Sequence, residues 1–324
     1  MSKLLQKFPE QDRLLKILES GRQWIRPRLL TTVKAQGFDF PVYGFVMGPD
    51  DPTLPTLGLF GGVHGLERIG SQTILAYFES LFEQLQWDSD LRARLSGVRI
   101  VSIPLVNPAG LYFGWRSNPN GVDLMRNSPV EARIKPAFVL GGHRVSPKLP
   151  WYRGEEGAAM ELEAQALVDF VKAEMFESSM AMALDVHSGF GFKDRLWYPF
   201  AGSHDPFPRM NEVKKLEELL NRSFPNHVYS VEPQAASYTT HGDLWDHLWE
   251  LHAESPGSKE RIFLPWTLEM GSWLWVRKNP LQLFSSMGVF NPVKIHRYRR
   301  TLRRHLPLID FLLRATKNHK EWIR

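Results

Sequence analysis

The chain has 324 residues, of which 43% are hydrophobic and 23% are charged, and none is cysteine. This composition is typical of a folded protein with a sizeable core, and it excludes disordered and collagen-like chains. The lack of cysteine excludes a disulfide scaffold, a thiol nucleophile and a Cys-ligated metal, so any metal ion must be held by histidine and carboxylate side chains.

The net charge of +5 is concentrated at the C-terminal end. Residues 292–324 carry ten Lys or Arg and two Asp or Glu, a net of +8, so the preceding residues sum to −3. Apolar residues recur at helical spacing among these arginines, namely Ile295, Tyr298, Leu302, Ile309 and Leu313. This spacing predicts a helix that docks through these residues and keeps its arginines in solvent. The alternative is a patch for nucleic acid or an acidic partner, and we expect no nucleic-acid binding.

No apolar run reaches the ~18 residues that span a bilayer, and charges interrupt the apolar residues at the start of the chain. The start therefore predicts an amphipathic helix rather than a leader sequence. We expect a cytoplasmic protein without membrane contact.

In chain order, the apolar pattern predicts alternating helices and strands. Helices are expected at residues 12–24, 67–85, 157–176 and 209–221, and at the C-terminal end, where Pro307 interrupts or kinks the last one. Strands are expected at residues 30–33, 40–47, 56–63, 98–106, 180–186 and 262–270. No repeat or linker marks a boundary, so we expect a single domain over residues 1–324. The alternation predicts an α/β sandwich, in which helices cover both faces of a mixed, mostly parallel sheet.

A histidine and a carboxylate follow the strand predicted at 56–63, in the segment Gly61-Gly62-Val63-His64-Gly65-Leu66-Glu67. Glycines after a strand allow a turn that aims His64 and Glu67 at one point in the crevice above the sheet. Alone, this spacing is a weak signal, because a histidine beside glycines is more often an ordinary loop residue.

A second histidine, His187, follows the strand predicted at 180–186. With His64 and Glu67 it completes the pattern of a three-ligand zinc site whose fourth position is open to water. Asp185 lies two residues earlier and points to the same side of an extended chain. It either orients His187 or is a plain polar residue at the strand end.

Glu269 interrupts the apolar strand predicted at 262–270. An ionised carboxylate in such a strand is costly unless it is paired or faces a cleft. Glu269 is therefore a candidate base beside a metal-bound water, and the alternative is an ion-paired strand residue.

Two arginines lie in the loop that follows the strand predicted at 98–106. The loop runs through Asn107-Pro108-Ala109-Gly110, Gly114-Trp115-Arg116 and Gly121-Val122-Asp123-Leu124-Met125-Arg126-Asn127. An arginine offers a fixed fork of donors to an oxyanion or a carboxylate. Arg116 and Arg126 are therefore candidate substrate-binding residues, although surface arginines are common.

Taken in order, these motifs resemble those of the zinc carboxypeptidase family of the carboxypeptidase A type. The order is His-x-x-Glu, Asn-Pro-x-Gly, Arg, Gly-Val-Asp-Leu-x-Arg-Asn, strand-His-Ser and strand-Glu. Further matches are Trp151-Tyr152-Arg153-Gly154, Trp197-Tyr198-Pro199-Phe200, and Gly242 with Asp246. The resemblance spans about residues 40–271 and leaves the N-terminal helix (about 1–28) and the basic C-terminal helix (about 292–324) outside. It implies the fold of that family and a zinc-dependent hydrolase.

The resemblance also implies roles for individual residues. His64, Glu67 and His187 bind Zn2+, a ligand set known from carboxypeptidase A. Glu269 is the general base, and Arg116 stabilises the oxyanion.

The implied substrate-binding residues depart from the family pattern. Arg126 holds the terminal carboxylate of the substrate, with Asn127 next to it, but Met125 replaces the amide expected before the arginine. In the register of the last motif the expected tyrosine is Trp249, and Tyr238 is a candidate replacement for its phenol. Methionine donates no hydrogen bond and tryptophan donates only through its indole N–H, which puts C-terminal exopeptidase action in question.

We therefore expect a zinc metallohydrolase that cuts a peptide or amide bond near a free carboxylate. The alternative enzyme is an N-acyl amino acid deacylase of the succinylglutamate desuccinylase and aspartoacylase type. The interval of 120 residues between Glu67 and His187 favours the peptidase. The third possibility is a non-catalytic binding relative, against which the intact ligands and base argue.

Overall fold

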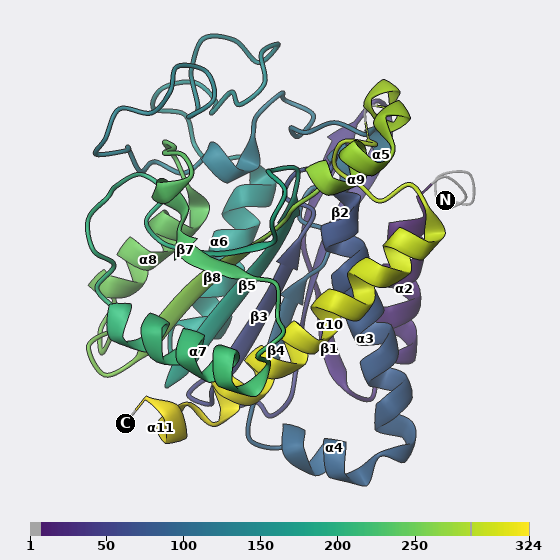
Figure 1. The fold of residues 1–324 in the computed structure, drawn as a ribbon, viewed down its shortest axis with the longest axis vertical. Helices are drawn as coiled ribbons and strands as arrows, with labels where there is room; N and C mark the ends of the chain where they lie inside the picture. Colours follow the sequence, from purple (N-terminus) through teal and green to yellow (C-terminus); the bar gives the residue numbers. More distant parts are fainter. Residues whose placement is uncertain (1–7, 286, 324) are drawn as a thin grey trace.

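Eight strands form one sheet in the computed structural model, which describes residues 8–285 and 287–323. The strands are β1 (Ile25–Ala35), β2 (Phe38–Met47), β3 (Thr56–Gly61), β4 (Arg99–Ile103), β5 (Met180–Ser188), β6 (Arg195–Tyr198), β7 (Ser230–Pro233) and β8 (Ile262–Met270). Their order across the sheet is β1-β2-β4-β3-β5-β8-β6-β7 (Figure 1). The central strands β4, β3, β5 and β8 are parallel, whereas β2 and β6 pair with them in the antiparallel sense. The predicted mixed, mostly parallel α/β sheet is confirmed.

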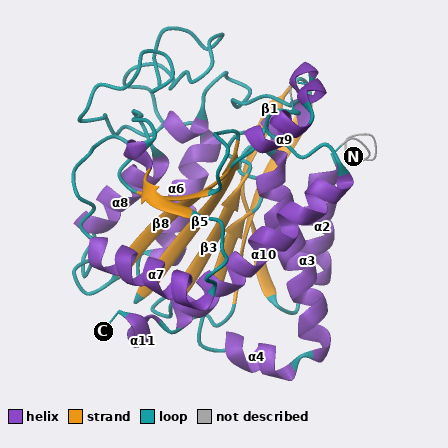
Figure 2. Ribbon diagram, viewed as in Figure 1, coloured by secondary structure: helices purple, strands orange, loops and turns teal. Residues whose placement is uncertain are grey.

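Helices cover both faces of this sheet (Figure 2). On one face, α3 (Arg68–Trp87) and α10 (Ile295–Lys317) pack against each other and against β3 and β5. On the other face, α6 (Leu162–Met175) packs against β1 to β3 and against α8 (Leu244–Glu254). The remaining helices are α2 (Pro9–Ser20), α4 (Ser89–Leu95), α5 (Pro108–Phe113), α7 (Met210–Ser223), α9 (Trp273–Lys278) and α11 (His319–Trp322), with the 3-10 helices η1 (Leu124–Arg126), η2 (Gln234–Ala236) and η3 (Pro280–Phe284).

The central strands are buried along their whole length because helices cover both of their faces. Every residue of β3, β4 and β5 is buried. Strands in such a position are nearly continuous apolar runs, so the apolar pattern predicts them well. The strands β6 and β7 were not predicted, because each has only four residues. The helix α8 was not predicted either, although Leu244, Trp245, Leu248 and Trp249 recur at helical spacing and are buried.

The C-terminal segment forms a docked helix, as its spacing predicts. Ile309 and Leu313 are buried, whereas most arginines in the first half of α10 are exposed. Pro307 lies inside α10 and does not interrupt it. The prediction is wrong for Ile295, because this residue begins the helix and its side chain is 63% exposed. Within the described part of the chain, no helix has the length and apolar character that crossing a membrane requires.

Candidate functional site

His64 and Glu67 lie in the turn between β3 and α3, at the carboxyl ends of the central strands. The turn depends on its glycines. Gly62 has a φ of +71°, and a Cβ on Gly65 would lie 2.0 Å from the carbonyl carbon of Gly110. This close approach holds the turn against the loop that follows β4.

Three buried side chains converge where β3 and β5 end. The Nδ1 atoms of His64 and His187 lie 2.9 and 3.0 Å from the two carboxylate oxygens of Glu67. The backbone N–H of Ser188 also donates to Glu67 Oε2, at 3.0 Å. One potential ligand atom from each of the three residues lies within 4.8 Å of the others. The structure therefore brings together the three predicted metal ligands.

A second carboxylate lies behind each histidine. His64 Nε2 is 2.9 Å from Asp123 Oδ1, and His187 Nε2 is 2.9 Å from Asp185 Oδ2. Trp245 Nε1 donates to the same oxygen of Asp185, at 3.0 Å. Such carboxylates orient an imidazole ligand and raise its basicity. Asp185 thus lies where the first of its two predicted alternatives requires, and its orienting role stays a prediction. Asp123, which stands in the quoted loop motif without a role, lies in the same way behind His64.

His64, Glu67 and His187, which we call the cluster, offer donor atoms that fit a zinc ion. Two imidazole nitrogens and one carboxylate are typical of catalytic zinc sites that keep a fourth position open. His64, Glu67 and His187 are each only 4% exposed. Ionisable groups buried this closely are costly unless they are compensated, and a cation held between them provides that compensation.

The charges of the cluster shift two of its pKa values. Burial alone would raise the pKa of Glu67, but His64 and His187 outweigh burial and lower it below its usual range. Burial alone would lower the pKa of His187, but the carboxylates of Asp185 and Glu67 raise it well above its usual value. Both shifts favour the charged forms of Glu67 and His187 in the metal-free protein, and a metal ion at Nδ1 of His187 would compete with a proton there.

Glu269 reaches the same place from β8. The pairing of β5 with β8 sets Glu269 opposite His187. The side chain is buried, and the backbone N–H of Phe190 donates to its Oε1 at 2.9 Å. Burial first, and then the charge of Glu67, raise the pKa of Glu269 to about 8. A carboxyl group with such a pKa can accept and return a proton near neutral pH.

Asp123 aligns two arginines with the cluster. Arg116 Nε and Arg126 Nη1 donate to Asp123 Oδ2, at 3.0 and 3.1 Å. Arg116 Nη1 also lies 3.3 Å from Glu67 Oε1. Burial opposes the ionisation of Asp123, but His64 and the two arginines together keep its pKa well below the usual value. Both predicted arginines are thus at the site.

These groups open into a cavity of about 790 Å3, which we call the site cavity. Much of its wall is apolar or aromatic, formed by Leu66, Met125, Leu140, Trp151, Phe190, Trp197, Trp273 and Phe290. Tyr238 also lines the cavity, and its ring packs against the rings of Phe190 and Trp197. Burial raises the pKa of Tyr238 to about 12, so its phenol keeps its proton and can donate a hydrogen bond.

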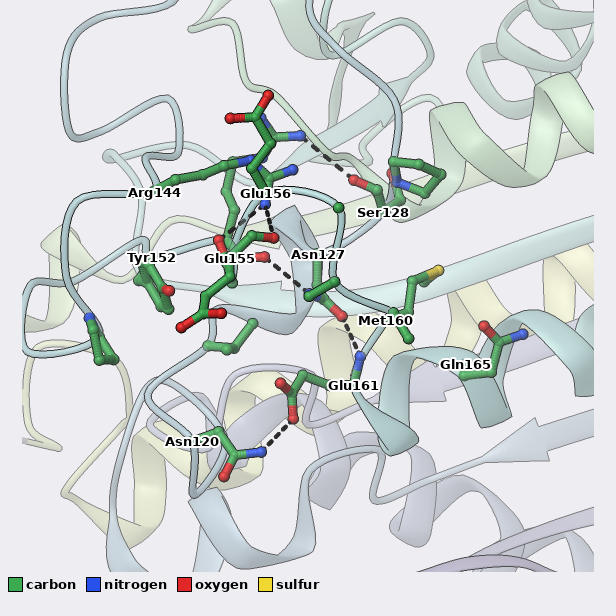
Figure 3. A pocket seen from close by; sticks show the side chains of 18 of the residues that line it. Asn120, Asn127, Ser128, Arg144, Tyr152, Glu155, Glu156, Met160, Glu161 and Gln165 are labelled. Atoms are coloured by element: carbon green, nitrogen blue, oxygen red, sulfur yellow. Dashed lines mark hydrogen bonds between the residues drawn. The ribbon is translucent and has the colours of Figure 1, made fainter.

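Two predicted substrate-binding residues lie elsewhere. Trp249 does not line the site cavity, because α8 turns it inward and its ring packs on Phe207 with 4.5 Å between centroids. Asn127 lines a second cavity of about 750 Å3, the neighbouring cavity shown in Figure 3. Its amide accepts from the N–H of Glu161 at 2.6 Å and donates to the carbonyl of Arg153 at 2.9 Å. The structure therefore does not bring Trp249 and Asn127 to the site cavity, and their contact with the substrate stays a prediction.

Comparisons with known proteins found a matching family, a relative of this chain and solved structures with the same fold. The model of the zinc carboxypeptidase family matches residues 26–264. Carboxypeptidase E of Caenorhabditis elegans is 34% identical over an alignment of 95 residues, and the match covers 25% of this chain and 20% of that protein. The match thus spans only about a fifth of that relative's length.

Solved structures with the same fold include two carboxypeptidase-related proteins. Bovine thrombin-activatable fibrinolysis inhibitor, in complex with tick carboxypeptidase inhibitor, has a TM-score of 0.66 and 14% identity, with 96% of each chain covered. Carboxypeptidase A from Helicoverpa armigera has a TM-score of 0.65 and 16% identity, with 95% of this chain and 72% of that chain covered. At these identities the similarity shows the fold alone.

Proposed function

Since the chain belongs to the zinc carboxypeptidase family, we propose that it is a zinc-dependent hydrolase that cleaves a peptide or amide bond next to a free carboxylate. One observation carries this proposal. A single cavity is lined by the three converging ligands, by the carboxyl group of Glu269 and by the guanidinium of Arg126. These groups supply metal binding, proton transfer and anion recognition within reach of one substrate.

The residues of the chain divide the chemistry among them. Zinc held by the cluster supplies a Lewis acid that polarises a carbonyl group and acidifies water. Glu269 accepts the proton of the attacking water and passes it to the leaving nitrogen. Arg116, whose side chain is 21% exposed beside Glu67, donates to the carbonyl oxygen as negative charge develops on it.

Arg126 anchors the substrate at the far side of the reacting bond. It lines the site cavity, where Tyr238 adds a phenolic donor. Met125 also lines the cavity, at the position where an amide is expected. The substrate carboxylate is therefore held by one charge-assisted contact with Arg126, without a second contact from an amide at position 125. One such contact is worth roughly 1.5–3 kcal/mol.

A second candidate function is that of an N-acyl amino acid deacylase of the succinylglutamate desuccinylase and aspartoacylase type. Met125 is the observation that favours it. Met125 cannot donate the hydrogen bond expected in a C-terminal exopeptidase at this position, whereas the groups that hydrolyse an amide bond are all present.

Hydrolysis assays on the full-length protein test the proposal. The substrates are peptides with a free C-terminus, the same peptides with an amidated C-terminus, and N-acyl amino acids, each assayed with and without a metal chelator. We expect turnover of the free peptides that the chelator abolishes and added zinc restores. Preferential cleavage of N-acyl amino acids would establish the second candidate instead, and turnover that survives complete metal removal would contradict both.

A further inference from the structure

The part of the chain between β8 and the middle of α10 is strongly cationic. Residues 270–309 contain no Asp or Glu, and their Lys and Arg residues are Arg277, Lys278, Lys294, Arg297, Arg299, Arg300, Arg303 and Arg304. We propose that this acid-free segment docks the protein on an anionic phospholipid membrane surface. The inference does not depend on the proposed hydrolase activity.

The 3-10 helix η3 in this segment reverses the usual arrangement of polar and apolar side chains. Gln282 is only 2% exposed, whereas Leu281 is 73%, Leu283 is 60% and Phe284 is 89% exposed. Side chains three residues apart in a 3-10 helix lie above one another, so Leu281 and Phe284 form one apolar edge. An apolar edge of this kind on a protein surface indicates an interaction site.

Hydrogen bonds hold η3 in the orientation that buries Gln282 and exposes its apolar neighbours. Arg297 of α10 donates to Gln282 Oε1 at 3.0 Å and to the carbonyl of Trp275 in α9 at 2.9 Å. Gln282 Nε2 donates to the carbonyl of Asn291 at 3.3 Å. Asn291 Nδ2 in turn donates to the carbonyl of Leu66, beside the metal-ligand turn, at 2.7 Å. These bonds keep α9, η3 and the start of α10 together, so the apolar edge lies close to the elements that carry the cations.

Most cations of the acid-free segment are available to a partner. Arg304 pairs with Asp194 at 2.8 Å, and Arg297 is used in the contacts above. The other six form no ion pair within residues 8–285 and 287–323, and all are exposed: Arg277, Lys278, Lys294, Arg299, Arg300 and Arg303. Clusters of four to eight such cations beside an amphipathic element are typical of binding to anionic lipids.

A lipid surface fits this combination better than a nucleic acid. At the headgroup boundary, Leu281 and Phe284 leave water while the cations stay level with the lipid phosphates. A nucleic acid offers no apolar layer to receive these side chains. In Figure 1, α9 and the chain that follows it stand out from the sheet at the upper right, where they can meet a flat surface.

Docking in this way brings the site cavity close to the membrane. Trp273 of α9 and Phe290 belong to the acid-free segment, and both also line the site cavity. The inference replaces the expectation of no membrane contact. It agrees with the expected cytoplasmic location, because the cytoplasmic leaflet is the one that carries anionic lipids.

Co-sedimentation of the full-length protein with phosphatidylcholine vesicles, prepared with and without phosphatidylserine, tests the proposal. We expect binding only to the vesicles that contain phosphatidylserine, and weaker binding at high salt. The triple variant Lys294→Gln, Arg299→Gln, Arg300→Gln is expected to lose roughly 100-fold in affinity, from about fivefold for each cation. The double variant Leu281→Ser, Phe284→Ser is expected to lose at least about tenfold, because its apolar edge no longer leaves water.

Two control variants carry the same kinds of change outside the acid-free segment. Trp87→Ser removes an apolar side chain that is 73% exposed at the far end of α3. The other control is the triple variant Lys34→Gln, Lys172→Gln, Lys214→Gln at exposed positions. Both should bind vesicles like the wild type, and thermal unfolding should show that every variant is folded.

Three outcomes would overturn the proposal. The first is absence of wild-type binding to vesicles with phosphatidylserine, and the second is an equal loss of binding in the control and test variants. The third is loss of binding in the charge variant alone, with full binding by Leu281→Ser, Phe284→Ser. That result would identify a surface for an anionic macromolecule that needs no apolar insertion.

Discussion

The site cavity and the neighbouring cavity have nearly equal volumes, about 790 and 750 Å3, but their ionisable groups are placed very differently. In the site cavity the metal ligands and Glu269 lie at or just after the ends of central strands and are buried close to one another. In the neighbouring cavity Glu155 and Glu156 are exposed on a loop (Figure 3). Arg153, which also lines this cavity, is already paired with Glu131. Volume therefore does not distinguish a metal site from a surface hollow. Converging buried ligands do, because their burial is costly without a bound cation.

Removal of the metal ligands gives the largest expected difference between the two cavities. The double variant His64→Ala, His187→Ala should fall from about one zinc ion per chain to nearly none, because only one ligand remains. His247→Ala, which changes a histidine of the neighbouring cavity, should keep the wild-type zinc content. Metal analysis of the purified proteins checks both. Full zinc occupancy in the double variant would show that the metal binds elsewhere.

Removal of the proposed base tests whether the site cavity is catalytic. Glu269→Gln should keep zinc and fold but lose at least ~10²-fold in kcat, since only proton transfer is removed. Glu156→Gln, in the neighbouring cavity, should hydrolyse the same substrate at the wild-type rate. Steady-state kinetics at equal zinc content provide the comparison. Near-normal turnover by Glu269→Gln would assign the base to another residue.

The carboxylates behind the histidines should matter less than the ligands themselves. Asp123→Asn and Asp185→Asn should each weaken zinc binding by about 10–100-fold, because the imidazole loses a partner that orients it. Glu131 and His241 form a similar pair outside the site cavity, with 2.7 Å between Oε2 and Nδ1. Glu131→Gln should leave zinc affinity unchanged. Competition with a chromophoric chelator measures all three, and unchanged affinity in both aspartate variants would refute the orienting role.

Zinc affinity should also depend on pH in a direction set by His187. Its pKa lies well above the usual value because Asp185 and Glu67 outweigh the effect of burial. Zinc must displace this proton, so binding should tighten as pH rises, by up to about tenfold per unit. Asp185→Asn removes one cause of the raised pKa and should flatten the dependence near neutral pH. A zinc affinity that is constant between pH 6 and 8 would contradict the protonated state of His187.

The smallest effect concerns Met125 at the carboxylate end of the site cavity. Met125→Asn restores an amide donor beside Arg126, which is worth about 1 kcal/mol as one hydrogen bond. It should lower KM several-fold for substrates with a free carboxylate and leave amidated substrates unchanged. Arg126→Ala should change the acid-to-amide preference in the opposite direction. An acid-to-amide ratio of kcat/KM that is the same in all three proteins would remove the carboxylate anchor from the proposed function.

The site residues whose positions the sequence predicts are those at or just after the ends of strands. Long apolar runs locate β3, β5 and β8, and the carboxyl ends of neighbouring strands lie at one edge of a sheet. The positions of His64, Glu67, His187 and Glu269 follow from this rule. Their approach to one another depends on strand order and register, together with the glycine turn that carries His64 and Glu67.

The residues that sequence analysis misplaced lie on elements without such a signal. Trp249 belongs to α8, a helix that was not predicted and whose buried face, shared with Trp245 and Leu248, turns the indole into the core. Asn127 stands directly after Arg126, but the amide of Asn127 is used by backbone groups of distant loop residues. The role of Asp123 likewise depends on a contact across 59 residues, which local spacing does not reveal.

A crystal structure of the zinc-loaded protein, with diffraction data collected at the zinc absorption edge, tests the central claim most directly. The account predicts one strong anomalous peak at about 2.0–2.2 Å from the Nδ1 atoms of His64 and His187 and from a carboxylate oxygen of Glu67. No peak is expected in the neighbouring cavity. A peak among the carboxylates of the neighbouring cavity, with none between His64 and His187, would contradict the account.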